Sequence, residues 1–259
     1  MDNNKAYKII IGILLLFIIA QWFVISKKPQ PGITRKPAEK QIAKIAIVID
    51  DWGYNSNNLE IAAQIPYPLT ASILPNLPYS RSMSEALHSA GFEIILHLPM
   101  ESHDKLKLEK NTILTNLNEK SIADIIAQDV ESLTYVKGVS NHMGSRATED
   151  SRTMGIIFKE LKKKNLYFLD SFVSSQSVCA ALARKITIPF AKRDIFLDNE
   201  QNKEYIKQQL YKLKKKADKY GQAIGIGHDR RTTLLVLKEI LPELQKAGYE
   251  FVFVSELVR

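Results

Sequence analysis

The feature that most constrains this 259-residue chain is a repeated pairing of a short β-rich run with a helical pattern. Seven such runs end on polar residues, and they cover residues 44–51, 69–75, 92–99, 138–142, 166–170, 222–228 and 250–255. Strands that alternate with helices form a mainly parallel sheet. We therefore predict an α/β domain, in which this number of strands favours a closed or distorted β/α barrel over an open doubly wound sheet.

The intervening segments carry apolar residues three and four positions apart, which predicts helices that pack one face on the sheet. The stripes lie within residues 122–133, 154–161, 206–213 and 234–244. Asp150 precedes the second of these helices and Thr232 or Thr233 the last, as capping residues do. These positions predict the core and carry no chemistry.

Polar residues that can act in catalysis recur where the predicted strands end. They are Asp50, Asp51, His97, Asn141, His142, Asp170 and His228, with Glu101 in the loop after His97. The carboxyl ends of parallel strands meet on one face of the sheet, so residues far apart in sequence are expected to form one site there.

Two aspartates and three histidines in that position have the composition of a catalytic metal site that keeps a place open for water. One carboxylate of the Asp50–Asp51 pair would bind the cation and the other would act as a base. Each residue also has a structural explanation: the pair could cap a turn, and a single histidine could be a hydrogen-bonded core residue. His88 and His103 lie in a helical segment and a polar loop and are not expected to take part.

The N-terminal part predicts a membrane anchor. Residues 9–25 are apolar except for Gln21, and 17 residues are just long enough for a spanning helix. A short tail of residues 1–8 precedes this span, a Pro/Lys-rich linker covers 26–43, and the domain covers 44–259. The basic residues after the span outnumber those before it, which by the positive-inside rule favours a cytoplasmic domain. The family resemblance described below favours export, and the two interpretations stay open.

The net charge of +8 comes mostly from the N-terminal part. Residues 1–44 hold eight Lys/Arg and two acids, so residues 45–259 hold 28 and 26, a net charge of +2. A nucleic-acid partner is therefore not expected. The single cysteine, Cys179, excludes an internal disulfide and a multi-cysteine metal site.

Six ordered motifs resemble the divergent polysaccharide deacetylase family, a branch of the carbohydrate esterase deacetylases with a distorted β/α barrel. They are IAIVIDDWGYN, ILHLPME, NHMGSR, FLDS, AKRDIFLDN and IGIGH. The resemblance implies that Asp50 is the base, Asp51 a metal ligand and His228 the general acid. It also implies that Asp170 orients the region of the base.

The chain departs from the family pattern at two motifs. The second motif normally supplies two metal histidines four residues apart, and here these positions are His97 and Glu101. His142 is the expected substitute ligand. The usual Arg-Pro-Pro motif is missing, so Arg146 or Arg193, with Asn141, is expected to orient the substrate.

The resemblance implies a metal-dependent hydrolase, with Zn²⁺ as the expected ion, that removes acetyl groups from an envelope glycan, N-acetyl groups in the first place and O-acetyl groups as an alternative. It implies an inner-membrane protein whose domain lies in the periplasm. The altered motifs leave a second interpretation open, a glycan-binding or scaffolding module that keeps the fold without the activity. A nucleic-acid-associated protein facing the cytoplasm fits the sequence least well.

Overall fold

The computed structural model describes residues 43–104 and 108–259, together with Ile13, Gln21 and Trp22. The chain divides into two units, residues 1–41 and residues 42–259. Apart from those three N-terminal residues, the predicted tail, membrane span and linker lie outside the described residues. Within the described part of the chain, no helix combines the length and the apolar character needed to cross a membrane.

Residues 42–259 form an α/β unit built on one nine-stranded sheet. The strands are β1 (Ala43–Trp52), β2 (Thr70–Ile73), β3 (Glu93–Met100), β4 (Val136–Met143), β5 (Tyr167–Asp170), β6 (Phe190–Lys192), β7 (Ile195–Phe196), β8 (Gln222–His228) and β9 (Tyr249–Val252). Their order is β6-β5-β4-β3-β2-β1-β8-β7, and β9 pairs with β1. All the strand pairs are parallel, as the alternation in the sequence predicts.

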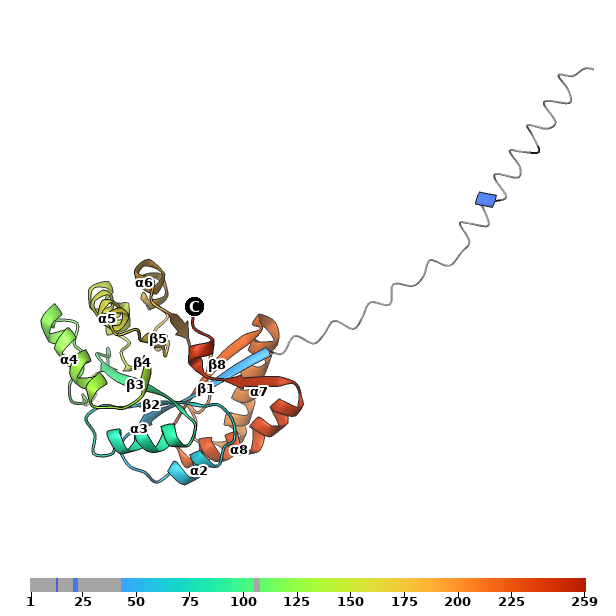
Figure 1. Ribbon diagram of the computed structural model, residues 1–259, viewed down its shortest axis with the longest axis horizontal. Coiled ribbons are helices and arrows are strands. Elements are labelled where there is room, and N and C mark those ends of the chain that lie inside the picture. The colour runs from blue at the N-terminus through green and yellow to red at the C-terminus, as the bar shows by residue number, and fades with distance from the viewer. Residues whose placement is uncertain (1–12, 14–20, 23–42, 105–107) are drawn as a thin grey trace, which may run out of the picture. The chain divides into compact units, whose positions relative to one another are not determined.

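The helices lie around the outside of the strands (Figure 1). They are α2 (Leu59–Ala63), α3 (Ser80–Ser89), α4 (Glu119–Glu131), α5 (Ser151–Lys163), α6 (Cys179–Ile186), α7 (Lys203–Tyr220) and α8 (Arg231–Lys246), with the 3₁₀ turns η1 (Ala147–Glu149) and η2 (Val254–Glu256). The predicted apolar stripes of α4, α5, α7 and α8 are buried or partly buried in the core. Asp150 caps α5 as predicted, by accepting a hydrogen bond from the Thr153 amide. The threonine cap predicted for α8 is wrong, because Arg230 precedes that helix.

Strand β1 shows how the sheet divides the core into two layers. Side chains alternate between the two faces of a strand. Ile45, Ile47 and Ile49 belong to the large cluster that includes the helix stripes, whereas Ala46 and Val48 belong to a smaller cluster made of residues from the strands and η2. The second cluster is the inner face of the curved sheet.

The sheet is a parallel half-barrel rather than a fully hydrogen-bonded ring. Between β5 and β8 runs one extended segment, which pairs with β5 through β6 and with β8 through β7. Among residues 43–104 and 108–259, no pairing joins β6 to β7. The prediction of a parallel α/β fold is thus confirmed. The sequence pattern missed β6 and β7, which have three and two residues and are too short for a periodic signal.

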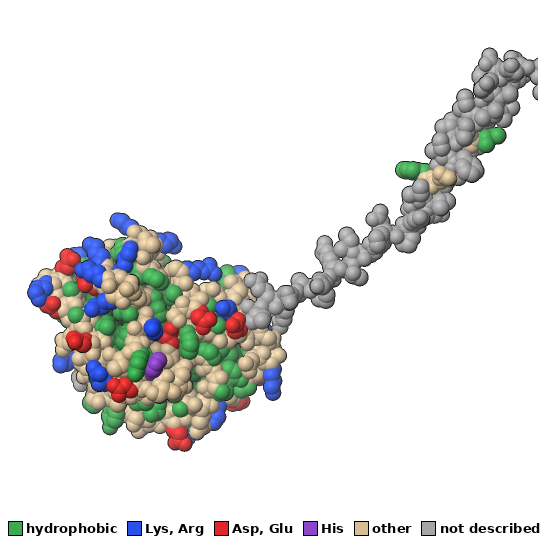
Figure 2. Space-filling model, viewed as in Figure 1, with side chains coloured by type: hydrophobic (Ala, Val, Ile, Leu, Met, Phe, Trp, Pro, Cys, Tyr) green, Lys and Arg blue, Asp and Glu red, His purple; other side chains and the backbone are tan. Residues whose placement is uncertain are grey.

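The surface agrees with the small net charge of the folded part. Figure 2 shows basic and acidic side chains interspersed over the face in view. The lysines at Lys162–Lys164 and within Lys212–Lys216 are exposed or partly exposed, and two of them pair with acids on their own helix. They are solvated helix faces.

Candidate functional site

The inner face of the half-barrel changes from apolar to polar at the carboxyl ends of its strands. On β1 the inward series Ala46, Val48 continues to Asp50, and on β8 the series Ile224, Ile226 continues to His228. On β3 Ile95 is followed by His97. The same two-residue period therefore directs a carboxylate and two imidazoles into one end of the inner layer.

Asp51 reaches the same site because β1 is irregular there. A side chain next to Asp50 would normally face the helices. The pairing of β1 with β2 shifts register between Ile49 and Trp52, and Asp51 has a left-handed backbone with φ of 67°. A β-bulge of this kind redirects a side chain. Two successive aspartates are thereby brought to one face.

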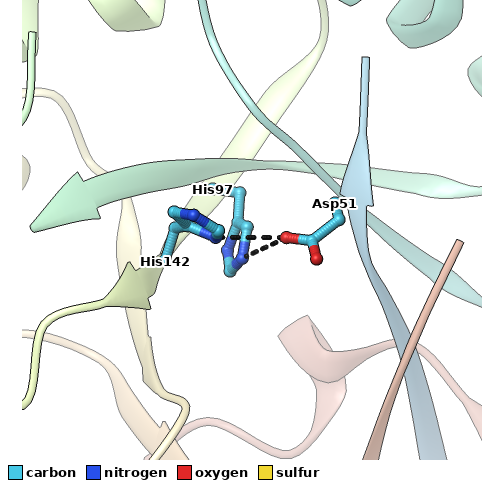
Figure 3. Close-up of side chains that lie close together, drawn as sticks. All are labelled: Asp51, His97 and His142. Carbon is cyan, nitrogen blue, oxygen red and sulfur yellow. Dashed lines mark ion pairs between the residues drawn. The ribbon is translucent and has the colours of Figure 1, made fainter. Parts of the chain in front are cut away.

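Asp51, His97 and His142 form a group that can hold a metal ion (Figure 3). Each offers one ligand atom, and these atoms lie within 4.8 Å of one another. Asp51 Oδ1 lies 3.3 Å from His97 Nε2 and 3.1 Å from His142 Nδ1. Burial raises the pKa of Asp51, but hydrogen bonds from His142 and His97 outweigh it and hold the pKa far below its usual range.

The residues present fit a divalent metal. One carboxylate oxygen and two imidazole nitrogens are a donor set that catalytic zinc sites use, with a further position left for water or substrate. Among the side chains that the structure describes, Asp50 Oδ1 and His142 Nε2 are buried and have no hydrogen-bond partner. Buried polar atoms are rarely left unpaired, and those that are call for a bound group.

Asp50 is almost completely buried, with 2% of its surface exposed. Its Oδ2 lies 3.7 Å from His97 Nε2. Burial raises the pKa of Asp50 above its usual value, and the charge of neighbouring Asp51 acts in the same direction. A carboxylate with a raised pKa and a free oxygen has the properties of a general base.

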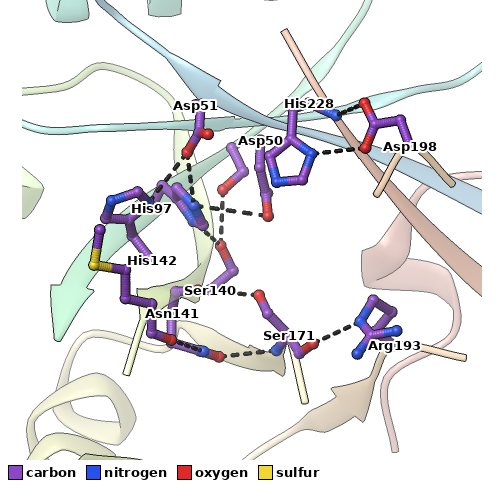
Figure 4. Close-up of polar contacts among 12 residues, drawn as sticks. Asp50, Asp51, His97, Ser140, Asn141, His142, Ser171, Arg193, Asp198 and His228 are labelled. Carbon is purple, nitrogen blue, oxygen red and sulfur yellow. Dashed lines mark hydrogen bonds and ion pairs between the residues drawn. The ribbon is translucent and has the colours of Figure 1, made fainter. Parts of the chain in front are cut away.

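Two serines that the sequence patterns did not single out support His97. The Ser140 hydroxyl lies 2.8 Å from His97 Nδ1 and 2.7 Å from the Ser72 hydroxyl (Figure 4). Both serines are fully buried on the inner face. Their period-2 positions on β2 and β4 were visible in the sequence, but nothing in the sequence showed that the two strands bring them together.

His228 forms a buried pair with Asp198, a residue that lay inside a recognised motif without an assigned role. Asp198 Oδ1 lies 2.7 Å from His228 Nδ1, and Asp198 Oδ2 accepts from the His228 amide and the Thr233 hydroxyl. Burial lowers the pKa of His228, but its hydrogen bond to Asp198 and the negative charges of Asp198, Asp51 and Asp50 together outweigh burial and raise the pKa. Asp198 leaves Nε2 as the ring nitrogen available to a substrate.

Asp170 and Asn141 organise a loop beside the site. Asp170 accepts hydrogen bonds from the Phe172 amide and the Ser177 hydroxyl, both in the segment that follows β5. Asn141 Oδ1 accepts from the Ser171 amide. The structure therefore gives both residues contacts within the scaffold, and their predicted roles in catalysis and substrate orientation stay predictions.

Arg193 is hydrogen-bonded to the backbone of the loop that follows β5. Its Nε and Nη2 donate to the Ser171 and Phe172 carbonyls at 2.6 and 2.8 Å, and its guanidinium stacks on the Phe196 ring. Burial lowers the pKa of Arg193 to about 10 although the charges of Asp170 and Asp50 raise it. Of the two arginines considered from the sequence, Arg193 is the one that acts on Asp50 electrostatically.

Glu101 stands outside the metal group in the part of the chain that the structure describes. Its Oε2 accepts from the amide and hydroxyl of Thr115 at 2.6 and 2.7 Å, and its Oε1 lies 3.2 Å from Arg146. Both carboxylate oxygens are thus engaged. Arg146 itself is 56% exposed, so this pair lies at the surface of the loop that follows β3.

The remaining histidines have partners of their own. His88 stacks on Tyr135, with ring centroids 3.9 Å apart, and His103 Nε2 lies 3.0 Å from Glu149. Both side chains are exposed. Neither belongs to the metal group within the described residues.

Comparisons with known proteins agree with this arrangement. Residues 47–258 match the family profile described as divergent polysaccharide deacetylase. The uncharacterized protein YibQ of Escherichia coli strain K12 is 35% identical over 201 residues, a match that covers 78% of this chain and 63% of YibQ. The matched region is therefore less than two thirds of that relative's length.

Solved structures share the fold. The uncharacterized protein ATU2773 from Agrobacterium tumefaciens C58 has a TM-score of 0.80 at 25% identity, covering 83% of this chain and 89% of that one. The Bc1960 peptidoglycan N-acetylglucosamine deacetylase has a TM-score of 0.52 at 14% identity, covering 84% and 88%. The second likeness shows the fold alone.

Proposed function

Because this chain belongs to the divergent polysaccharide deacetylase family, we propose that it is a metal-dependent hydrolase that removes acetyl groups, N-acetyl groups in the first place, from an envelope glycan. The observation that carries the proposal is the grouping of Asp51, His97 and His142 next to a buried carboxylate with a free oxygen. The fold alone supports only deacetylase-type architecture.

In this proposal Asp51, His97 and His142 hold the divalent ion, for which Zn²⁺ is the candidate. When bound, the ion supplies Lewis-acid chemistry that polarises the acetyl carbonyl and stabilises negative charge on its oxygen. Asp50 accepts a proton from the attacking water through its unpartnered Oδ1. Arg193 keeps positive charge near Asp50 and so favours its ionised form.

His228 donates a proton to the leaving amine. Asp198 holds the Nδ1 side of the ring and raises the pKa of His228, so that the imidazole keeps its extra proton to higher pH than an ordinary histidine does. A base and an acid on neighbouring strands, paired in register as Asp50 and His228 are, can serve the two proton transfers of amide hydrolysis. No part of this assignment uses Glu101.

The substrate class follows from the family and from the likeness to a peptidoglycan N-acetylglucosamine deacetylase. We propose that residues 9–25 anchor the chain in the inner membrane and that the domain acts in the periplasm, where envelope glycans are found. A reporter enzyme that is active only after export, fused to the C-terminus, tests this placement. An inactive reporter, together with activity of a second reporter that works only in the cytoplasm at the same position, would contradict it.

The function is tested on the purified full chain by elemental analysis and by acetate release from N-acetylated glycan fragments. We expect close to one equivalent of zinc per chain, and its loss in Asp51→Ala and His142→Ala. His88→Ala, which removes an exposed histidine outside the metal group, is the matched control and retains the metal.

A folded wild-type protein that binds no divalent ion after incubation with zinc would overturn the proposal. That outcome would favour the glycan-binding module, whose signature is glycan binding without acetate release. Acetate release that is lost with the metal would exclude the module.

A further inference from the structure

A line of two buried hydroxyls lies behind His97, a member of the metal group. His97 Nδ1 contacts the Ser140 hydroxyl at 2.8 Å, and the Ser140 hydroxyl contacts the Ser72 hydroxyl at 2.7 Å. The line therefore engages the ring nitrogen of His97 that does not face Asp51.

The two ring nitrogens of His97 have separate partners. Nε2 lies 3.3 Å from Asp51 Oδ1, where the metal group lies, and Nδ1 is engaged by the Ser140 hydroxyl. A ring that turned Nε2 away from Asp51 would lose its contact with Ser140, and Ser140 is held in turn by Ser72. The two hydroxyls therefore hold the ring with Nε2 toward the metal group.

We propose that Ser72 and Ser140 are positioning residues, a hydroxyl relay that fixes the ring orientation of His97 for metal binding. This inference rests on the proposed metal-dependent function. The hydrogen bond on one ring nitrogen sets which nitrogen is free to ligate, and such outer partners raise metal affinity.

Packing alone gives no reason for hydroxyls at these positions. Ser72 lies on β2 and Ser140 on β4, and both side chains are fully buried on the inner face, whose neighbouring members are Val48, Ile95 and Leu169. Burying a hydroxyl costs free energy unless it is hydrogen-bonded, so alanine or valine would fill this layer at lower cost. The two hydroxyls satisfy each other, and Ser140 also satisfies His97 Nδ1.

The relay is tested by zinc affinity, measured on the full chain by competition with a chromophoric chelator. We expect Ser140→Ala to bind zinc about 10- to 100-fold more weakly. Ser72→Ala, which removes no contact to any metal ligand, should also weaken binding, and the double variant should be no worse than Ser140→Ala, because both act through one line. The cobalt-substituted protein should show a shifted visible absorption spectrum in each variant.

The matched control is Ser84→Ala, which removes a fully buried hydroxyl paired with Thr134 at 2.9 Å on the helical side of the domain. It should leave zinc affinity and the cobalt spectrum unchanged. Circular dichroism and thermal melting verify folding; if Ser140→Ala does not fold, Ser72→Ala and Ser140→Thr, which keeps the hydroxyl, provide the test.

The outcomes separate the relay from the proposed function. Wild-type zinc affinity in folded Ser72→Ala and Ser140→Ala would overturn the relay and leave the deacetylase proposal standing. An effect of Ser140→Ala alone would reduce the relay to a local contact and overturn the role of Ser72. A wild-type chain that binds no metal would overturn both proposals together.

Discussion

Two buried carboxylates lie at opposite ends of the same parallel sheet and are treated differently by their surroundings. Glu93 begins β3, is 8% exposed, and its Oε1 accepts from Tyr167 Oη at 2.7 Å, Thr70 Oγ1 at 3.1 Å and the Ser255 amide at 3.2 Å. Asp50 lies near the end of β1, is 2% exposed, and keeps one oxygen without a partner among the described residues.

The difference separates a polar group that stabilises the fold from one that is kept ready for chemistry. Glu93 joins β2, β3, β5 and the η2 turn, and its partners balance the cost of burial. Asp50 is buried beside a second carboxylate, and burial raises its pKa. A catalytic role, or an ion or water that the oxygen binds, explains a buried carboxylate oxygen of this kind.

The largest expected effect is on turnover at the Asp50 end. Asp50→Ala should lower kcat about 100- to 10,000-fold, because it removes the proposed base. It should retain about one equivalent of zinc at saturating concentration, and chemical unfolding should show no loss of stability. A loss of activity accompanied by loss of metal would contradict the assignment of Asp50 as base and Asp51 as ligand.

At the opposite end of the sheet, replacing the buried carboxylate of Glu93 by alanine should lower the stability of the fold and leave zinc binding intact. Glu93→Ala leaves the Tyr167 and Thr70 hydroxyls without their acceptor, so we expect the free energy of unfolding to fall by about 2–4 kcal/mol. Glu93→Gln keeps an acceptor oxygen and serves as the control with a smaller loss. Should zinc affinity fall in folded Glu93→Ala, the two ends of the sheet would not be independent.

The Asp198–His228 pair combines the two cases. It lies at the end of the sheet that carries the site, like Asp50, and both carboxylate oxygens of Asp198 have hydrogen-bond partners, so Asp198 resembles Glu93. The pKa of His228 is raised in the folded state, so its contribution to stability is present below its unfolded pKa of about 6.5 and is lost as pH rises through the folded pKa. Asp198→Asn should reduce this pH dependence of stability. It should also move the alkaline limb of the pH profile of kcat/KM to lower pH. An unmoved limb would remove His228 as the general acid.

The smallest effect is expected at Glu101, which is near the site and yet fully engaged. Arg146→Ala removes a pair in which the arginine is 56% exposed. Exposed ion pairs contribute about 0–1 kcal/mol, so the melting temperature should hardly change. Zinc affinity should also stay the same, measured as above. A higher affinity would mean that the freed Glu101 joins the ligands.

Much of the fold could be predicted because its signals are local. The alternation of β-rich runs with amphipathic stretches identified the parallel sheet and its main helices, and Asp150 was recognisable as a cap from its position alone. The short strands β6 and β7 escaped prediction, since they are held by pairing with β5 and β8 and not by their own periodicity. The membrane span predicted for residues 9–25 lies outside the described residues except at Ile13, Gln21 and Trp22.

By itself, then, the sequence determined the family, the class of fold and the set of polar residues at the strand ends, because hydrophobic period and motif order are properties of the chain. Only the tertiary structure decided which of those residues meet. The bulge at Asp51 turns a second carboxylate inward, Thr115 and Arg146 occupy Glu101, and strands far apart in sequence bring Asp198 to His228 and Ser72 to Ser140. Contacts of this kind depend on strand register and side-chain direction in space, which no linear spacing encodes.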